Sequence, residues 1–358
     1  MRSKYPPLRN YEAKRIALIK PSALGDVLNA LPVLTALRQR YPLAHIAWVV
    51  NRAFAPLLDG HPDLNETIAF DRHIKGLRGL GVLGSLLLTL RRQRFDLVID
   101  LQGLLRSGLM SLATGARRRV GLTSAREGSR FCYTDVIDDA SHFEGMHAVD
   151  RYWLVAEALG VGEDPKKFRL PQIEDSWRRW VHKLLVSCPR PWLAVAVGAR
   201  WETKRWPPEH FAALLRRAQE RFGGTAIFIG AGADVELAAR TSALLHGPFV
   251  DVTGKTPALP ALTALLSVVD VMISNDTGPL HLGRALGRPV VAPYTCTKVR
   301  RNGPYGGEAG AVEVDLWCQG SYLKRCDRLE CMNLLGADQL WPALERTLLE
   351  WERTCRSA

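Results

Sequence analysis

Short apolar runs alternate with helical patterns along the chain. In the first half, the runs cover residues 15–20, 45–50 and 95–101, and a helical pattern follows the first of them from residue 27 to about 40. Continuous apolar runs of this length, bounded by polar or turn residues, are typical of buried strands. Because expected strands alternate with expected helices, the pattern predicts an α/β fold with a doubly wound parallel sheet.

The second half repeats the alternation. The expected strands lie at residues 192–197, 225–230, 249–252, 268–273 and 289–292. A proline-containing and charged passage, residues 162–191, separates the two series, and the end of the chain carries Leu340, Leu344 and Leu348 at helical spacing. We therefore expect a first domain over residues 1–170, a second similar domain over 171–336 and a C-terminal helix over 337–358.

The charge of the chain indicates an anionic partner. Lysine and arginine number 48 against 36 aspartate and glutamate, which gives a formal net charge of +12. Nucleic acid, an anionic lipid surface, and a phosphorylated or carboxylated sugar all fit this charge. Arg117, Arg118, Arg119 and Arg126 lie in an arginine-rich stretch, residues 106–130, for which we expect a solvated face or contact with an acidic acceptor. No aromatic signature for stacking bases accompanies the charge, so nucleic acid is not favoured.

Two features of the sequence bear on where in the cell the protein is found. The apolar run at residues 79–90 is too short to span a bilayer, and its leucines fit one face of a helix. Arg78, Arg91, Arg92 and Arg94 flank it and would permit contact with an anionic membrane, although packing on its own domain is favoured. The first residues lack the apolar core of a signal peptide, and the seven cysteines are odd in number and scattered, so we expect a cytoplasmic protein.

Polar residues follow several of the expected strands. Asp276, Thr277 and Gly278 come after the run at 268–273, and the following proline suits the first turn of a helix. A helix that begins there offers an anion site, whereas the alternative is simple capping. Asp26 stands in the same relation to the first strand, again with capping as the alternative. Carboxyl edges of parallel strands are where α/β folds bind ligands.

Two further turns have the same placement. Lys204 lies in a loop after the run at 192–197, just before a helix, where a lysine could neutralise a phosphate, although such a loop is more often simply solvated. The turn Gly230-Ala231-Gly232 is only superficially similar to a dinucleotide fingerprint, because the third glycine is missing and the turn lies in the second half. It could still approach a nucleotide, with Asp234 or Glu236 accepting hydrogen bonds from ribose.

In combination, these motifs resemble the ADP-heptose:lipopolysaccharide heptosyltransferases, which are inverting glycosyltransferases of the two-domain GT-B fold. The resemblance covers nearly the whole chain. The motifs that carry it are residues 20–27 (KPSALGDV), 100–107 (DLQGLLRS), 147–151 (HAVDR), 204–207 (KRWP) and 275–281 (NDTGPLH), with the turn at 303–306 (GPYG).

The resemblance implies a metal-independent transfer, with no cofactor, between two Rossmann-like lobes that face a central cleft. Asp26 matches the general base that deprotonates the acceptor hydroxyl. The matches on the donor side are Lys204, Thr277 and Gly278 for the diphosphate, Asp276 and His281 for the shape of the donor site, and Asp234 for the nucleoside.

The resemblance also implies an acceptor, an inner-core lipopolysaccharide that carries carboxylates and phosphates. Gln102, Arg106 and Arg151 match its motif positions, and Arg52 is a looser candidate. Such a substrate predicts peripheral contact with the inner face of the inner membrane, and no nucleic-acid partner. The alternatives are the same chemistry with another nucleotide sugar and a protein or other glycan acceptor, a nucleic-acid-binding protein, and a catalytically silent sensor of sugar nucleotides.

The cysteines near the C-terminus raise a separate possibility. Cys318, Cys326 and Cys331 have the spacing C-x7-C-x4-C, and Cys296 could be a fourth thiol. Standard zinc sites use more closely spaced pairs of ligands. Buried free thiols are therefore favoured over a structural metal.

Overall fold

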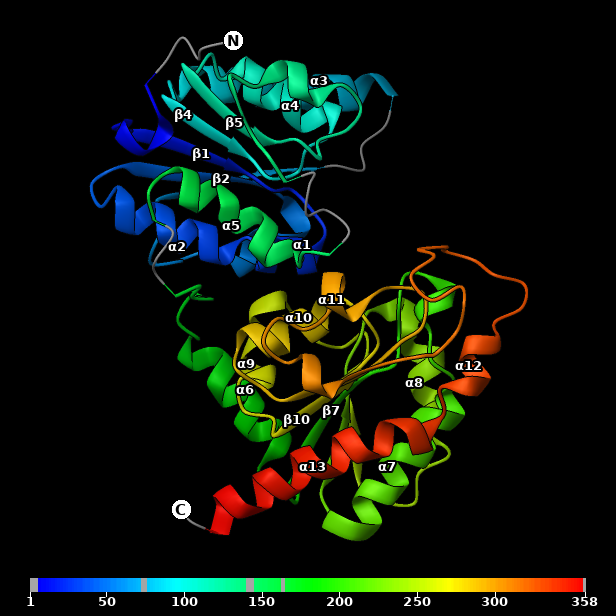
Figure 1. Cartoon of the computed structure of the whole chain (residues 1–358). Coiled ribbons are helices and arrows are strands. Elements are labelled where there is room, and N and C mark those ends of the chain that lie inside the picture. Colours follow the sequence, from blue (N-terminus) through cyan, green and yellow to red (C-terminus); the bar gives the residue numbers. More distant parts are fainter. Residues whose placement is uncertain (1–5, 72–75, 140–144, 162–164, 357–358) are drawn as a thin grey trace. The chain divides into compact units, whose positions relative to one another are not determined.

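The computed structural model describes residues 6–71, 76–139, 145–161 and 165–356, and the side chains of residues 76–80, including the Arg78 of the sequence analysis, lie outside the description. The first five residues, part of the stretch assessed for a signal peptide, and residues 162–164 of the expected interdomain passage also lie outside it. The chain divides into two compact units, Met1–Gln172 and Ile173–Ala358, which we call unit 1 and unit 2 (Figure 1).

Unit 1 is an alternation of strands, α-helices and short 3-10 helices (η). Its described elements are η1 (Leu8–Asn10), β1 (Arg15–Ile19), α1 (Leu24–Asn29), α2 (Leu31–Arg40), β2 (His45–Asn51), η2 (Arg52–Leu57), β3 (Glu66–Phe70), α3 (Gly76–Arg92), β4 (Leu97–Asp100), α4 (Leu105–Ala113), β5 (Arg118–Leu122), η3 (Ser129–Cys132), β6 (Asp135–Ile137) and α5 (Ala148–Ala158).

The described strands of unit 1 form one parallel sheet in the order β3-β2-β1-β4-β5-β6. Helices α3 and α4 lie on one face of the sheet, and α1, α2 and α5 lie on the other (Figure 1). Because both faces are covered, β1 is apolar and buried along almost its whole length. The predicted doubly wound parallel sheet is confirmed.

The arginine-rich stretch corrects one expectation. Arg118 and Arg119 open strand β5 and do not form a solvated face. Arg118 is 1% exposed, and its guanidinium makes two hydrogen bonds, of 2.8 and 2.6 Å, to the Asp135 carboxylate on β6. Arg119 donates to the backbone carbonyls of Ala116 and Cys132. Paired carboxylates and carbonyls allow these charges to be buried, so this part of the run is structural.

The helix expected from residue 27 to 40 is two helices. Helix α1 ends at Asn29 and α2 begins at Leu31, with Pro32 in its first turn. Proline has no backbone N–H to bond the preceding turn, so a continuous helix would lose a hydrogen bond there, whereas the first turn of a new helix tolerates it.

The leucine-rich helix α3 packs on its own sheet. Leu86 and Leu90 are buried in a core with residues of β1, β2 and β4, and Leu83 and Leu87 pack against that core. The favoured alternative for this segment is therefore confirmed. Within the part of the chain that the structure describes, no helix combines the length and hydrophobicity that a bilayer span needs.

Unit 2 repeats the alternation. Its described elements are α6 (Asp175–Leu185), β7 (Trp192–Ala196), η5 (Glu202–Lys204), α7 (Pro208–Phe222), β8 (Thr225–Phe228), η6 (Gly232–Asp234), α8 (Val235–Ser242), β9 (Phe249–Asp251), α9 (Leu259–Leu266), β10 (Val271–Ser274), α10 (Gly278–Ala285), β11 (Val290–Tyr294), α11 (Val299–Asn302), η7 (Glu308–Gly310), β12 (Ala311–Glu313), α12 (Glu330–Leu334) and α13 (Ala337–Arg356).

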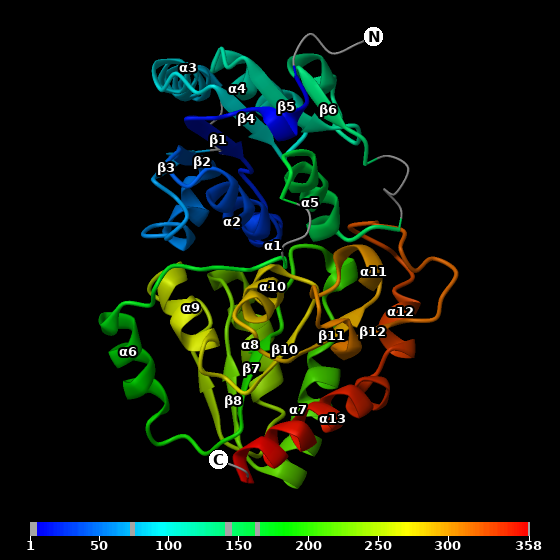
Figure 2. The same cartoon turned by 60° about the vertical axis from the view of Figure 1, so that its left-hand side comes forward.

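The described strands of unit 2 form a second parallel sheet, in the order β12-β11-β10-β7-β8-β9. Helix α13 packs against α7 and β11, and α6, α9 and α10 form a separate group of neighbours (Figure 2). Leu340, Leu344 and Leu348 of α13 are buried in the main core of the unit. Trp206, also buried there, donates from its indole nitrogen to the Leu335 carbonyl, 2.5 Å away, just before α13.

Candidate functional site

Both sheets have the same strand order, and this order places a ligand site. In each unit the first strand lies between the second and the fourth, so the connections leave in opposite directions on either side of it. The crevice outside the carboxyl ends of such strands is the usual ligand site of doubly wound sheets. In unit 2 these ends lead into residues 197–206, 229–234 and 275–278, which contain the expected donor residues except His281, on α10.

A cavity of about 640 Å³ opens at this edge of unit 2. It is bounded by the loops after β7, β8 and β10 and by the start of α9. Its lining residues are Ala196, Gly198, Ala199, Arg200, Arg205, Ile229, Gly230, Ala231, Ala233, Asp234, Thr256, Ala258, Leu259, Leu262, Thr277 and Pro279. Apolar side chains with a few convergent polar groups are the composition expected of a small-molecule pocket. We call it the unit 2 pocket.

Asp234 is held against two glycines in this pocket. Its carboxylate accepts a 2.9 Å hydrogen bond from the Ala231 N–H, which closes the turn after β8. A Cβ atom on Gly198 would lie 2.0 Å from the Asp234 carboxylate, and one on Gly230 would lie 2.9 Å from it. The two glycines therefore make the space that Asp234 occupies, and its remaining lone pairs can accept from hydroxyls in the pocket.

Asp276 is the centre of a buried polar cluster. Its carboxylate accepts from the Lys204 ammonium at 2.5 Å and from the Thr297 hydroxyl at 2.7 Å. The His281 Nε2 lies 3.7 Å from the other carboxylate oxygen. The Lys204 ammonium also lies 4.6 Å from the centre of the Trp201 ring. Two of the expected donor residues, Lys204 and His281, thus contact a third, Asp276.

The cluster holds Asp276 in its charged form. Burial by itself raises the pKa of the Asp276 carboxyl, but hydrogen bonding to His281 and the positive charge of Lys204 outweigh it and lower the pKa to about 2. The carboxylate does not cap helix α10, which contradicts the capping alternative. Lys204 does not line the unit 2 pocket, so its charge acts on Asp276 first.

The start of α10 faces the unit 2 pocket through Thr277 and Pro279. The Thr277 hydroxyl does not cap the helix. It lies 3.2 Å from the Ser274 hydroxyl and donates to the Asn275 carbonyl at 3.3 Å. The first N–H groups of a helix have no partner within the helix, so Gly278 begins a turn suited to an anion.

Asn275 joins this turn to the loop after β7 that contains Lys204. It is fully buried, accepts from the Trp206 N–H at 3.1 Å and donates to the Val197 carbonyl at 2.8 Å. One amide therefore joins the end of β10 to the loop after β7. The sequence places Asn275 in the motif without indicating this role.

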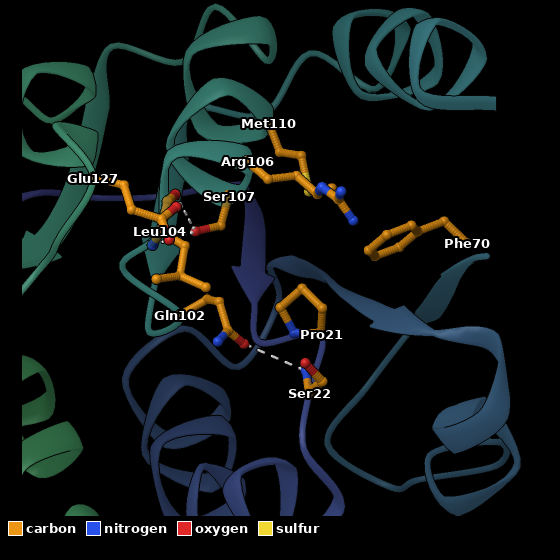
Figure 3. Close-up of a pocket in the computed structure, with 9 residues that line it drawn as sticks. All are labelled: Pro21, Ser22, Phe70, Gln102, Leu104, Arg106, Ser107, Met110 and Glu127. Atoms are coloured by element: carbon orange, nitrogen blue, oxygen red, sulfur yellow. Dashed lines mark hydrogen bonds between the residues drawn. The ribbon is translucent and has the colours of Figure 1, made fainter. Parts of the chain in front are cut away.

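Unit 1 has a smaller cavity, about 200 Å³, at the equivalent edge of its sheet (Figure 3). Gln102 accepts from the Ser22 N–H at 3.4 Å and thereby joins the loops after β4 and β1. Arg106 extends from α4 toward Phe70 at the end of β3 (Figure 3). Leu104, Ser107, Met110, Pro21 and Glu127 complete the lining. Gln102 and Arg106, two expected acceptor residues, therefore share one pocket, which we call the unit 1 pocket.

Asp26 lies in the first turn of α1, beside this loop. Its carboxylate accepts from the Ala23 N–H at 3.0 Å, which is a capping contact, and from the Tyr152 hydroxyl at 3.3 Å. The buried Lys20 ammonium lies 4.8 Å from the centre of the Tyr152 ring and donates to the Leu101 carbonyl. Burial lowers the pKa of Lys20, but the charge of Asp26 and the contact with Tyr152 more than offset this and raise it. Asp26 thus caps its helix and also faces a buried cation.

The other two expected acceptor residues lie outside the unit 1 pocket. Arg52 begins η2 and pairs with Asp71 at 3.0 Å, largely exposed. Arg151 on α5 is mostly buried, with its Nε 3.8 Å from the Asp139 carboxylate. Asp139 also accepts from the hydroxyls of Ser124 and Thr123. The four residues are therefore not one cluster.

The four C-terminal cysteines do come together. Cys296, Cys318, Cys326 and Cys331 line a cavity of about 370 Å³ in unit 2. Burial, together with the three neighbouring thiols, raises the pKa of Cys331 to about 11, so it is a thiol at neutral pH. Among the described residues, no group of three or more His, Cys, Asp or Glu side chains is arranged to hold a metal ion.

Sequence reasoning missed several residues of these sites. Arg200 and Arg205 flank Lys204 and line the unit 2 pocket, although the sequence predicted a phosphate-binding role for the lysine alone. Tyr152 contacts Asp26 from 126 positions away, and Thr297 contacts Asp276. For Tyr152, the one signal in the sequence was its position directly after the motif at residues 147–151.

Comparison with known proteins gives the family of the chain. The model of glycosyltransferase family 9 (heptosyltransferase) matches residues 83–332. The chain is similar to the lipopolysaccharide core heptosyltransferase OpsX of Haemophilus influenzae, at 28% identity over 94% of this chain and 97% of the relative. It is also similar to lipopolysaccharide heptosyltransferase 1 of Pseudomonas aeruginosa, at 31% identity over 87% of each chain.

A solved structure gives the same result for the fold. The glycosyl transferase family 9 protein of Veillonella parvula superposes with a TM-score of 0.83 at 25% identity, over 95% of this chain and 99% of that one. The chain, with its two doubly wound units, thus has the GT-B fold.

Proposed function

The chain belongs to glycosyltransferase family 9, the heptosyltransferases, and from this premise we propose that it transfers heptose from ADP-heptose to the inner core of lipopolysaccharide. The transfer inverts the anomeric carbon and needs no metal ion. The observation that carries the proposal is the pairing of sites at equivalent sheet edges, with a nucleotide-sized pocket in unit 2 and a carboxylate, Asp26, in unit 1.

The unit 2 pocket would hold the nucleotide. Asp234 accepts hydrogen bonds from ribose hydroxyls, and the apolar walls of Ala231 and Leu259 enclose the base. The diphosphate lies at the start of α10, at Thr277 and Gly278, where unpaired N–H groups favour an anion. Arg200 and Arg205, which also line the pocket, supply cationic donors.

In this scheme Lys204, Asp276 and His281 position the diphosphate site. Before the donor binds, the buried Lys204–Asp276 pair has little net charge and holds the start of α10 in place. Binding of the diphosphate draws the Lys204 ammonium toward it, since the ammonium can donate three hydrogen bonds. This contact stabilises the charge that builds on the leaving ADP.

Asp26 acts as the general base. The acceptor hydroxyl oxygen forms a bond to the anomeric carbon of heptose, the bond from that carbon to the diphosphate oxygen breaks, and the hydroxyl proton moves to the Asp26 carboxylate. Ala23 and Tyr152 fix the carboxylate through hydrogen bonds, and Lys20 provides a permanent positive charge beneath it. ADP leaves with the electron pair of the broken bond.

The acceptor occupies unit 1. Gln102 and Arg106 line the pocket that would hold part of it, and Arg106 can pair with a carboxylate or phosphate of the inner core. Arg52 and Arg151 would contact more distant parts of the same substrate. A lipid-linked acceptor of this kind places the enzyme in the cytoplasm, at the inner face of the inner membrane.

The test is a transfer assay that measures ADP release from ADP-heptose with inner-core lipopolysaccharide. We expect Asp26→Asn to lower the rate by about 100-fold or more, because a positioned base contributes that much. The matched control is Asp59→Asn, an exposed aspartate of the same unit, which keeps its activity. Calorimetric titration with ADP should give the same affinity for wild type and Asp26→Asn. Turnover within a few-fold of wild type would contradict the assignment of the base.

A further inference from the structure

Helix α4 exposes an apolar stripe. Leu105, Leu109 and Leu112 are 45%, 40% and 48% exposed. Their spacing, four and then three residues, puts them on one face of the helix. The residues between them, including Ser107, Met110 and Ser111, are buried against the rest of unit 1. The side of α4 that faces away from the rest of unit 1 is therefore apolar. A surface helix usually has a polar outer side.

A neighbouring turn adds to this stripe. The 3-10 helix η3 packs on the Gly108 side of α4, where a Cβ atom would meet Ser129 and Cys132 at 3.0 and 3.1 Å. Gly108 and the stripe are adjacent on the helix surface. On η3, Phe131 is 94% exposed. We call Leu105, Leu109, Leu112 and Phe131 the α4 apolar surface.

Arginines accompany this surface. Between residues 105 and 131, Glu127 is the single acidic residue of the sequence. Its carboxylate accepts from the Leu105 N–H at the start of α4. Of the arginines in this segment, Arg118 and Arg119 are tied into β5, whereas Arg117, Arg126 and Arg130 are exposed. Arg130 lies on η3, which packs on α4, and Arg126 is three residues before η3, so exposed arginine accompanies the apolar side chains. This combination matches a surface that is anionic outside and apolar beneath.

We propose that the α4 apolar surface docks on an anionic lipid bilayer, with its leucines and Phe131 entering the interfacial region and the arginines contacting the headgroups. The proposal rests on the proposed function, because it supplies the surface from which a lipid-linked acceptor is taken. Helix α4 also carries Arg106 and Met110 of the unit 1 pocket, so the docking surface and the acceptor pocket belong to one element.

Charge decides between a bilayer and a second copy of the chain. If two copies met through this face, the exposed arginines of one would be brought close to those of the other. Like charges brought together in an interface oppose association. An anionic bilayer instead attracts each exposed arginine.

Vesicle flotation tests the proposal without any transfer reaction. The probes are vesicles of phosphatidylcholine and phosphatidylglycerol in equal parts, and vesicles of phosphatidylcholine alone. We expect the full-length protein to float with the anionic vesicles and to be released by salt. The double variant Leu109→Gln, Leu112→Gln should bind about tenfold more weakly, because less apolar surface enters the membrane.

Matched controls test whether binding depends on the α4 apolar surface itself, and not on any exposed leucine or arginine. Leu43→Gln removes an even more exposed leucine, 97% exposed, from a loop of the same unit and should bind like wild type. Arg130→Gln should weaken binding, whereas Arg9→Gln, an exposed arginine in η1, should weaken it less. All variants should keep the wild-type unfolding temperature, since these side chains are exposed.

Two results would overturn the proposal. One is equal vesicle binding by wild type and the double leucine variant. The other is a wild-type dimer that the leucine changes convert to monomer while vesicle binding stays unchanged. Failure of the proposed function would look different from failure of the docking proposal. It would leave vesicle binding intact and abolish transfer even to a soluble, deacylated acceptor. If both proposals hold, the leucine variant loses activity only toward acceptor embedded in vesicles.

Discussion

At the scale of single residues, the buried pair of Lys204 and Asp276 shows how partners determine a role. From the sequence, Asp276 could be a cap or a donor-site residue. In the structure its carboxylate is taken by Lys204, which lies 72 positions away, and by Thr297 and His281. Sequence separation hides such contacts, because only the fold brings the loops after β7, β10 and β11 together. The position of the residue was predictable, but its partners were not.

Stability of the protein should depend on the ionisation of Asp276. Its pKa of about 2 is below the ordinary value of 3.8. The charged form therefore stabilises the fold above pH 4, and this contribution, about 2 kcal/mol, is lost as the pH falls from about 4 to about 2. Urea unfolding of wild type and Asp276→Asn across this range should show a difference that is largest at neutral pH and shrinks toward pH 2.

An exposed ion pair provides the control for this measurement. Asp338 pairs with Arg217 at 3.2 Å, but its side chain is 90% exposed. Asp338→Asn should change the free energy of unfolding by less than about 1 kcal/mol at any pH. If the difference in unfolding free energy between wild type and Asp276→Asn did not change with pH, the proposed dependence of stability on Asp276 ionisation would be wrong.

At the scale of elements, the close approach of the turn after β8 to the end of β7 is the feature most sensitive to change. Gly198→Ala places a Cβ atom 2.0 Å from the Asp234 carboxylate, so the carboxylate must leave its position. We expect ADP affinity, measured by calorimetry, to fall about tenfold, as for the loss of a hydrogen bond to a charged group.

Gly232→Ala is the matched control, because a Cβ atom at Gly232 in the same turn meets nothing within 4 Å. It should bind ADP like wild type. Equal affinity of the Gly198→Ala variant would show that Asp234 does not contact the nucleotide.

The C-terminal helix α13 is part of the core of unit 2. Leu344 is fully buried there against α7 and the sheet. Leu344→Ala should lower the free energy of unfolding by about 3 kcal/mol through lost burial and the cavity left behind. Leu334→Ala in α12, where the leucine is half exposed, should cost less than about 1 kcal/mol in the same urea titration. A small effect at Leu344 would mean that the helix is only loosely docked.

The strands that the sequence did not predict, β3, β5, β6 and β12, lack a long continuous apolar run. Strands β6 and β12 have three residues each, and β5 begins with two arginines. Strand β3 lies at an edge of its sheet and is only partly buried, and Arg118 is tolerated inside β5 because Asp135 on β6 pairs with it. Central strands such as β1 and β10 are buried on both faces and were predictable for that reason.

At the scale of the whole molecule, the alternation of strands and helices predicted two doubly wound units, and the strand orders confirm them. The positions of ligand sites followed from the same rule, since loops after parallel strands open at one edge. The identity of the wall residues, such as Leu259 and Phe70, did not follow, because any residue near the edge could have lined a pocket.

A thermal-shift series with nucleoside diphosphates and their sugars tests the donor at this scale. ADP-heptose at about a hundredfold excess over its dissociation constant should stabilise the protein by about 2.7 kcal/mol, through binding to the folded state alone. UDP-glucose at the same concentration is the control and should shift the unfolding temperature less. Stabilisation by UDP-glucose alone would favour the alternative with another nucleotide sugar.

The shared strand order has a consequence for synthesis on the ribosome. In each unit, every strand after the first pairs with one that has already been translated: β2 and β4 with β1, β3 with β2, β5 with β4, and β6 with β5. Unit 2 repeats this sequence of events from β7 to β12. Each sheet can therefore grow outward from its oldest strand as the polypeptide emerges, and no nascent strand has to wait for a partner that is not yet made.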